Sequence, residues 1–235
     1  MKVGRRLLEG AFIARENRFR ARVRLAGEER AAHVPNSGRL TELLSPDHPI
    51  LLAEARSPHR VTDYDLLMVS LPHTLVSIDA RLPNKLFHEA VENCALPEFL
   101  HYSVAQREVV YGDSRLDFLL EADGERGACL VEVKSVTLVQ EGIGRFPDAV
   151  TERGARHLNE LRRASLDGNR TAVVFVIQRA DAEAFAPHDE SDARFGEVLR
   201  EVAFDGVEVY SYTCGVSRSE IVVRKRVPVL LGGDV

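Results

Sequence analysis

The chain has 235 residues but no tryptophan, and aromatic residues make up only 6% of it. Sugar-binding sites commonly stack aromatic rings on the sugar, so this composition argues against a carbohydrate-binding protein. No apolar run approaches the roughly 20 residues that cross a membrane. The start of the chain contains arginines and lacks the apolar segment of a signal peptide. We therefore expect a cytoplasmic protein that has no membrane partner.

Cysteine is also scarce in this sequence. The three cysteines, Cys94, Cys129 and Cys214, are far apart and do not form a C-x-x-C pair. This pattern argues against a disulfide framework and against a zinc knuckle. We expect all three thiols to be small buried side chains.

The formal net charge of −5 conceals an uneven distribution of charge along the chain. Residues 1–30 contain nine lysines and arginines against four glutamates, so this segment carries +5 and the rest of the chain carries −10. A basic segment is suited to a polyanionic partner such as DNA. The acidic remainder is suited to holding carboxylates for a metal ion.

The most informative stretch covers residues 114–135, SRLDFLLEADGERGACLVEVKS. Two short apolar runs flank a polar segment that contains the turn dipeptide Asp123-Gly124. Runs of this length on either side of a turn predict two antiparallel strands. We therefore expect a β-hairpin here.

Carboxylates lie at the edges of both predicted strands. Because successive side chains of a strand point to opposite faces, Glu132 and Lys134 share one face and Asp117 lies opposite them. Two carboxylates and the Val133 carbonyl would form a site of hard oxygen atoms suited to Mg²⁺ or Mn²⁺. Lys134 would then stabilise negative charge on a phosphoryl oxygen. The alternative is that Glu132 and Lys134 neutralise each other on the exposed face of an ordinary amphipathic strand.

Two resemblances extend this interpretation. An aspartate, a strand and then Glu-x-Lys resemble the core of the PD-(D/E)xK nuclease superfamily, with Asp117, Glu132 and Lys134 in the matching positions. Five sequence words, in order along nearly the whole chain, resemble the sugar fermentation stimulation protein family. They are His-x-Pro-Asn-Ser-Gly at 33–38, Leu-Pro-Asn at 82–84, Arg-Leu-Asp-Phe at 115–118, Val-Glu-Val-Lys at 131–134 and Phe-Pro-Asp-Ala-Val-Thr-Glu-Arg-Gly at 146–154.

The family resemblance implies both a fold and a function. It implies an α/β protein of two domains: an OB-like β-barrel at residues 1–82 and a restriction-endonuclease-like α/β domain with a mixed sheet at residues 83–235. It also implies DNA binding without strong sequence specificity, linked to the regulation of sugar metabolism, particularly maltose use. Nucleases of the superfamily often carry an acidic residue on the first helix, and Glu89 is the best match to it.

The residue patterns independently support this architecture. Several short strands and a helical turn at residues 39–44 suit a small barrel. A helix capped by Asn84 and reaching about residue 95 would begin the second domain. The apolar run at residues 171–178, which follows a predicted helix at 147–165, indicates a buried strand in a parallel crossover. Residues 135–145 contain two glycines and are expected to form a mobile loop.

Residues 18–25 give the most regular strand signal in the chain. One predicted face is apolar and directed to the core, and the other is entirely arginine. Four like charges on one strand face repel each other, so phosphate groups are the natural partner. The alternative is that acidic residues of neighbouring strands pair with these arginines. The apolar face consists of Phe19, Ala21, Val23 and Leu25, and the basic face of Arg18, Arg20, Arg22 and Arg24.

The predicted helix at 147–165 adds a second basic surface. Arg153 and Arg156 would guide a phosphodiester strand towards the metal site, and His157 would position a water molecule or a phosphate. The alternative is a solvated helix face whose arginines pair with glutamates of the same helix.

Two functional hypotheses from different classes therefore compete. In the first, the chain is an Mg²⁺- or Mn²⁺-dependent phosphodiesterase that cleaves DNA or RNA, with Asp117, Glu132, Lys134 and Glu89 as its catalytic residues. In the second, it is a DNA-binding protein that retains a nuclease-like metal site without cleavage. A carbohydrate-binding regulator ranks last, and the oligomeric state is open.

Overall fold

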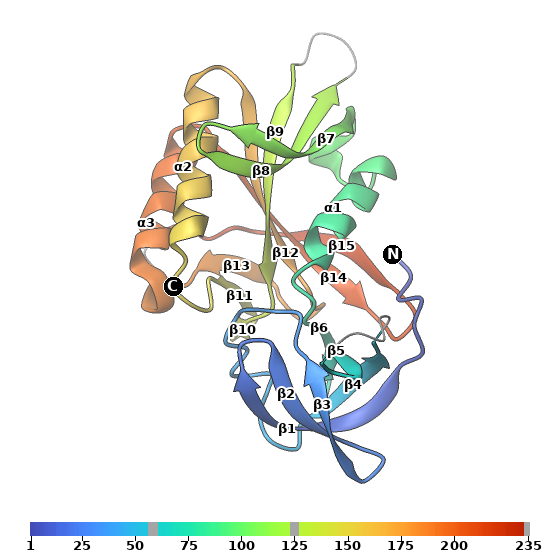
Figure 1. The fold of residues 1–235 in the computed structure, drawn as a ribbon. Coiled ribbons are helices and arrows are strands. Elements are labelled where there is room, and N and C mark those ends of the chain that lie inside the picture. Colours follow the sequence, from blue (N-terminus) through green and yellow to red (C-terminus); the bar gives the residue numbers. More distant parts are fainter. Residues whose placement is uncertain (56–60, 123–126, 233–235) are drawn as a thin grey trace.

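The computed structural model describes residues 1–55, 61–122 and 127–232, which form a β-barrel and an α/β domain (Figure 1). No helix in the described ranges is long and apolar enough to cross a membrane. The predicted architecture, an N-terminal OB barrel followed by an α/β domain with a mixed sheet, is confirmed.

The barrel is built from the first six strands, in the order β3-β2-β1-β4-β5-β6, and a parallel pairing of β3 with β5 closes it. The predicted alternation in β2 is present, because Ala21 and Val23 are fully buried in the barrel core. The strands are β1 (Leu8–Asn17), β2 (Arg20–Leu25), β3 (Glu28–His33), β4 (Pro49–Glu54), β5 (Tyr64–Ser70) and β6 (Leu75–Ser77).

One prediction for the barrel is wrong. Arg18 and Phe19 lie in the turn before β2, and the ring of Phe19 is exposed rather than part of the core. The helical turn predicted at residues 39–44 is present as a single turn, in which the Leu44 N–H donates to the Leu40 carbonyl at 2.9 Å. Leu40 and Leu43 are buried in the barrel.

The α/β domain is organised on a mixed sheet in the order β15-β14-β12-β9-β8-β7. β12 pairs in parallel with both β9 and β14, which confirms the predicted crossover, and the remaining strands are antiparallel. The strands are β7 (Tyr102–Tyr111), β8 (Ser114–Ala122), β9 (Cys129–Val136), β12 (Arg170–Ile177), β14 (Glu208–Val216) and β15 (Ile221–Val227).

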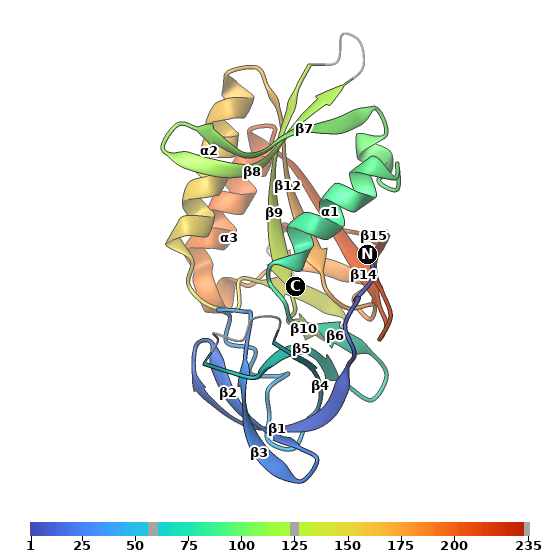
Figure 2. The same ribbon diagram turned by 45° about the vertical axis from the view of Figure 1, so that its right-hand side comes forward.

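Helices cover both faces of this sheet (Figure 1; Figure 2). On one face α1 (Leu82–Glu92) packs against alternate buried residues of β9, β12 and β14, and a 3-10 turn (Pro97–Phe99) follows it. On the other face α2 (Glu152–Leu166) and α3 (Asp189–Phe204) pack against the intervening residues. The buried sheet thus holds the open edge of β9 in a fixed position.

Several predicted boundaries of this domain differ from the observed ones. Asn84 does not cap α1, which begins at Leu82. α2 begins at Glu152 rather than near residue 147, because the Thr151 side chain caps it by accepting the Gly154 N–H at 3.0 Å. The expected loop at 135–145 contains β10 (Val139–Gln140) and β11 (Ile143–Phe146), which form a small sheet with β13 (Ala184–Pro187). Cys94 is exposed, whereas the other two cysteines are buried.

The start of the chain contacts the α/β domain before it enters the barrel (Figure 2). The Met1 amine donates to the Ile221 carbonyl at 2.8 Å, and the Ile221 N–H donates back to Met1 at 2.9 Å. Leu51 and Met68 of the barrel also join the core beneath α1. The two domains therefore share packing, and the division at residue 82 stays a prediction.

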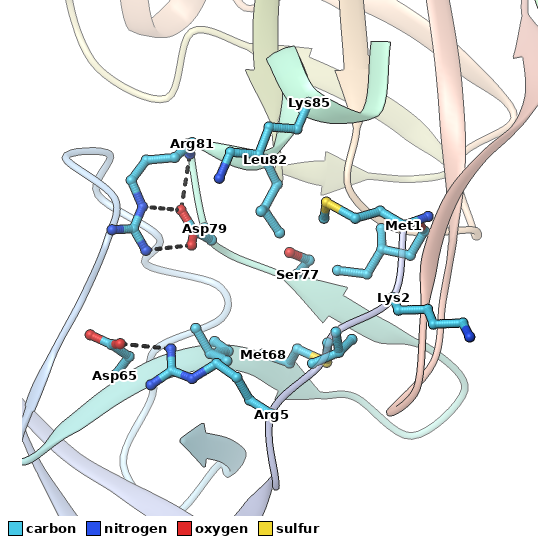
Figure 3. Close-up of a pocket in the computed structure, with 13 residues that line it drawn as sticks. Met1, Lys2, Arg5, Asp65, Met68, Ser77, Asp79, Arg81, Leu82 and Lys85 are labelled. Atoms are coloured by element: carbon cyan, nitrogen blue, oxygen red, sulfur yellow. Dashed lines mark hydrogen bonds and ion pairs between the residues drawn. The ribbon is translucent and has the colours of Figure 1, made fainter. Parts of the chain in front are cut away.

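A cavity of about 480 Å³ lies at this junction (Figure 3). Arg5 pairs with Asp65 at 2.8 Å and Arg81 with Asp79 at 2.6 Å, so the charge of each arginine is compensated. Lys85 projects from the first turns of α1 at the edge of the cavity. These contacts fix the start of α1 between the barrel and the site described next.

Candidate active site

The candidate site is the edge of β9 beyond the residue at which its backbone pairing with β8 ends. Backbone pairing of β8 with β9 ends at Phe118 and Val131, whereas β12 follows the other edge of β9 to Val136. On the open side, the Val133 N–H donates to Asp117 Oδ2 at 2.8 Å. The predicted antiparallel hairpin is confirmed, although its turn at 123–126 lies outside the described residues. Backbone groups and side chains of β9 are therefore available to a ligand at this edge.

Asp117 is held by two hydrogen bonds. Besides Val133, the Asn84 side-chain amide donates to Asp117 Oδ1 at 2.6 Å. Burial, together with the negative charge of Glu132, raises the pKa of Asp117 from 3.8 to about 6. Asn84 was predicted as a helix cap, and its position in the Leu-Pro-Asn word was the only sequence signal for a role at this site.

Glu132 is the most enclosed carboxylate of the site, with only 3% of its surface exposed. Its Oε1 atom accepts from Lys134 Nζ at 2.6 Å and lies 2.6 Å from His157 Nδ1. Burial alone would raise the pKa of Glu132, but Lys134 and the hydrogen bond from His157 outweigh burial and lower it. The Oε2 atom is buried and has no hydrogen-bond partner in the described part of the chain.

His157 reaches the site from α2, as the sequence predicted. Because an ionised carboxylate only accepts hydrogen bonds, the Nδ1 atom of His157 carries a proton in its contact with Glu132. Its Nε2 atom accepts from Arg153 Nε at 3.3 Å. Helix α2 thus contributes the buried His157, which positions Glu132, and Arg153, which contacts His157.

The oxygen atoms at this edge are of the kind that coordinates a divalent cation. In a strand, the N–H and C=O of one residue point to the same side, so the Val133 carbonyl faces the same side as its N–H bond to Asp117. An unpartnered Glu132 oxygen, the Asp117 carboxylate and this carbonyl are hard oxygen ligands. No group of three histidine, cysteine, aspartate or glutamate side chains within the described ranges is arranged to hold a metal ion. The residues present therefore suit a cation that keeps several water molecules.

Glu89 does not join this cluster. Its carboxylate lies 2.9 Å from the Met1 amine, and 43% of its side chain is exposed. Asn84, which reaches Asp117, is five residues earlier on α1 and so points about 140° away around the helix. The structure therefore brings together Asp117, Glu132 and Lys134 but not the fourth predicted catalytic residue.

The arginines of β2 carry acidic partners, which was the alternative interpretation of that strand. Each side chain extends from the barrel surface to a carboxylate of a neighbouring segment. The pairs are Arg20 with Glu16 at 2.6 Å, Arg22 with Glu29 at 3.2 Å and Arg24 with Asp47 at 2.9 Å.

Three other predicted phosphate-binding arginines are not paired in this way. Arg18, Arg153 and Arg156 are exposed, and none of them forms an ion pair with another described residue. Uncompensated cations attract phosphate more strongly than cations that already have a carboxylate partner. Among the arginines predicted to bind phosphate, those without an acidic partner in the described part of the chain therefore lie in the turn before β2 and on α2.

Comparison with known proteins places the chain in a family. A model for the SfsA N-terminal OB domain matches residues 13–78, and one for the sugar fermentation stimulation protein RE domain matches residues 81–220. The chain belongs to the sugar fermentation stimulation protein family. A homologue from Clostridium kluyveri is 44% identical over 96% of this chain and 97% of its own, and one from Clostridium acetobutylicum is 41% identical over 98% and 100%.

A solved structure of the family also matches the whole chain. It is the Pyrococcus furiosus SfsA in complex with Ca²⁺, which is 31% identical, has a TM-score of 0.89 and covers 98% of each chain. Four of the five sequence words that resemble the family meet in space at the site. Asn84, Asp117, Glu132 and Arg153 come from four of these words and are linked to one another through Val133 and His157 or directly.

Proposed function

We propose that this member of the family binds nucleic acid and hydrolyses phosphodiester bonds with a divalent metal ion at Asp117 and Glu132. One observation carries this proposal: Glu132 is buried beside Lys134 on an open strand edge, and its Oε2 atom has no hydrogen-bond partner among the described residues. Lys134 and His157 lower the pKa of this carboxyl despite its burial. A buried carboxylate oxygen without a partner is costly, and a bound cation would remove that cost.

Each residue of the site would have a distinct role in catalysis. Asp117, Glu132 and the Val133 carbonyl would hold Mg²⁺ or Mn²⁺, which supplies an activated water molecule and offsets negative charge on the phosphate. Lys134 is anchored on Glu132 and would stabilise charge on a phosphoryl oxygen. His157 fixes the rotamer of the Glu132 side chain through its Nδ1 hydrogen bond. Asn84 and the Val133 N–H keep Asp117 facing the metal.

The arginine side chains without acidic partners support a nucleic-acid substrate. Arg153 contacts His157 from α2, so it would bind a phosphate that flanks the scissile bond. Arg156 lies about 100° further around the helix from His157 and would bind a phosphate farther along the strand. Arg18 would bind a more distant phosphate at the barrel. The paired arginines Arg20 and Arg22 would contribute less, because a phosphate must first displace Glu16 or Glu29. The Ca²⁺ complex of the related Pyrococcus furiosus protein supports a divalent-cation site in this family.

A second candidate function is DNA binding without cleavage, linked to the regulation of sugar metabolism. It is favoured by the position of Glu89, which leaves two acidic side chains at the site among the residues that the structure describes. A cation held by two carboxylates and a carbonyl would raise the affinity for phosphate without activating water. The link to maltose use rests on the resemblance to the family alone.

The two candidates are separated by a cleavage assay. End-labelled single-stranded DNA, double-stranded DNA and RNA are incubated with the protein in Mg²⁺, Mn²⁺ or EDTA, beside Glu132→Gln and Lys134→Ala. Metal-dependent cleavage by the parent that is lost in both variants supports the enzyme. Binding that is unchanged by EDTA, with no cleavage in any metal, contradicts the enzyme and leaves the DNA-binding protein.

A further inference from the structure

A second cavity, of about 270 Å³, lies where the barrel meets the end of β9 and the segment before α2. The barrel contributes residues 36–38 and Arg18 to its wall. The α/β domain contributes Ser135, Arg145 and Thr151. Ser135 directly follows Lys134, and Thr151 lies six residues before His157, or about 9 Å along the axis of α2. The cavity is therefore a close neighbour of the candidate metal site.

A contact between Gly38 and Asp148 forms one wall of this cavity. A Cβ atom on Gly38 would lie only 2.3 Å from Asp148 Oδ2, so the Asp148 side chain would have to move if residue 38 carried one. The same Asp148 oxygen accepts the Leu40 N–H at 3.4 Å. The two domains thus meet closely here, and the cavity between them has a defined shape.

A partly buried guanidinium lies beneath the barrel side of the cavity. Arg15 donates to five carbonyl oxygens, those of Asn17 at 3.2 Å, Arg18 at 2.5 Å, Asn36 at 2.9 Å, Gly38 at 2.6 Å and Arg39 at 2.7 Å. These bonds tie the turn before β2 to the loop that lines the cavity. They also place a positive charge below the cavity floor.

The electrostatic balance of the cavity favours an anion. Among the described residues that line it, Arg18 and Arg145 stand against the carboxylate of Asp148. Behind this lining, the Arg15 guanidinium and the Glu42 carboxylate both lie close to Asp148 and offset each other. The Arg145 Nε atom is buried and has no hydrogen-bond partner among the residues that the structure describes. A phosphate group would accept from such an atom and compensate its charge.

An exposed aromatic ring, that of Phe19, directly follows the cavity residue Arg18 in the turn before β2. The ring of Phe19 is 49% exposed and is stacked on His33, with centroids 6.3 Å apart and planes 30° apart. The Val34 N–H donates to the Phe19 carbonyl at 2.9 Å, which holds the turn against the strand that leads into the cavity loop. An exposed ring on a barrel surface is a platform on which a nucleobase can stack.

We infer that the substrate is a single strand of nucleic acid that stacks a base on Phe19 and places one phosphate in the Arg18–Arg145 cavity. From there the strand continues along α2 to the metal site. This inference rests on the proposed function and names its substrate class. A duplex does not fit this path, because its bases stack on each other and leave no face for Phe19.

The absence of tryptophan from the chain allows a direct test. Phe19→Trp creates a single emitter at the proposed stacking position. Phe204→Trp is the matched control, because Phe204 is 92% exposed at the end of α3. Both full-length variants are titrated with a thymidine oligonucleotide in EDTA, while anisotropy of a labelled copy reports binding. We expect at least twofold quenching of the Phe19→Trp emission on binding and none at the control position.

Arg18→Gln and Arg145→Gln test the phosphate in the cavity. We expect each to weaken single-strand binding and to lower the slope of log affinity against log salt by about 0.7. Arg18 is exposed, so its variant keeps the fold even where the Arg145 variant does not.

Each contrary result has a distinct meaning. Single-strand binding without a change in Phe19→Trp emission overturns the proposed path and leaves the proposed function intact. Equal quenching by a blunt duplex overturns the assignment of a single strand. Failure of the parent protein to bind any nucleic acid overturns both this inference and the proposed function.

Discussion

Asp117 and Glu132 are neighbouring carboxylates whose conservative amide substitutions should change stability in opposite directions. Asp117 has a pKa raised to about 6 by burial and by the charge of Glu132, against 3.8 when exposed. This shift corresponds to a cost of about 3 kcal/mol when the carboxylate is ionised. The cost is absent below pH 4, grows as the pH rises towards 6 and is complete above pH 7. Asp117→Asn should therefore stabilise the metal-free protein by up to about 3 kcal/mol at pH 8.

Glu132→Gln should have the opposite effect. Lys134 and His157 hold the pKa of Glu132 below its usual range, so its ionised form contributes stability at neutral pH. That contribution is lost as the pH falls through the lowered pKa. Removing the charge leaves Lys134 without its partner in a nearly dry site, which costs about 3 kcal/mol.

The assay is urea unfolding of the parent and both variants between pH 4.5 and 8 in EDTA. We expect the free energy of unfolding of Asp117→Asn to exceed that of the parent, with a difference that grows with pH. A difference that does not vary with pH, or a loss of stability at pH 8, would refute the reasoning about Asp117. A stabilising Glu132→Gln would refute the reasoning about the ion pair.

Three further predictions follow from the site and its surroundings. Lys134→Ala should reduce cleavage at least about 100-fold, as measured by single-turnover kinetics, while calorimetry shows Mn²⁺ affinity within a few-fold of the parent. Arg156→Gln should lower the salt slope of DNA binding by about one, whereas the matched Arg20→Gln should lower it by less, and equal effects would contradict the role given to ion pairing. Gly38→Ala should cost about 1–3 kcal/mol in urea unfolding because its Cβ meets Asp148, and an unchanged midpoint would contradict that close contact.

Local patterns in the sequence predicted much of this structure. The hairpin of β8 and β9 follows from two apolar runs around a turn, and the buried positions of β2 follow from strict alternation. The crossover through β12 follows from an unbroken apolar run after a helix. These features depend on residues close in sequence, so period and spacing are sufficient to reveal them.

The details that the sequence could not give depend on contacts between distant segments. Arg24 finds its carboxylate at Asp47, and Glu89 is drawn to the Met1 amine, although nothing local distinguishes these partners. Phe19 follows the alternation of β2 but falls in the preceding turn, so its ring is exposed. Asn84 reaches Asp117 only because packing of α1 brings residues 33 positions apart into contact.

The central claim is that the open edge of β9 holds a divalent cation between Asp117 and Glu132. Anomalous diffraction from crystals soaked in Mn²⁺ tests it most directly, since the scattering locates the ion without reference to activity. The account predicts a peak within coordination distance of Asp117, Glu132 Oε2 and the Val133 carbonyl, absent from Asp117→Asn crystals. A peak elsewhere, or no peak at Mn²⁺ concentrations that saturate binding in solution, would contradict it.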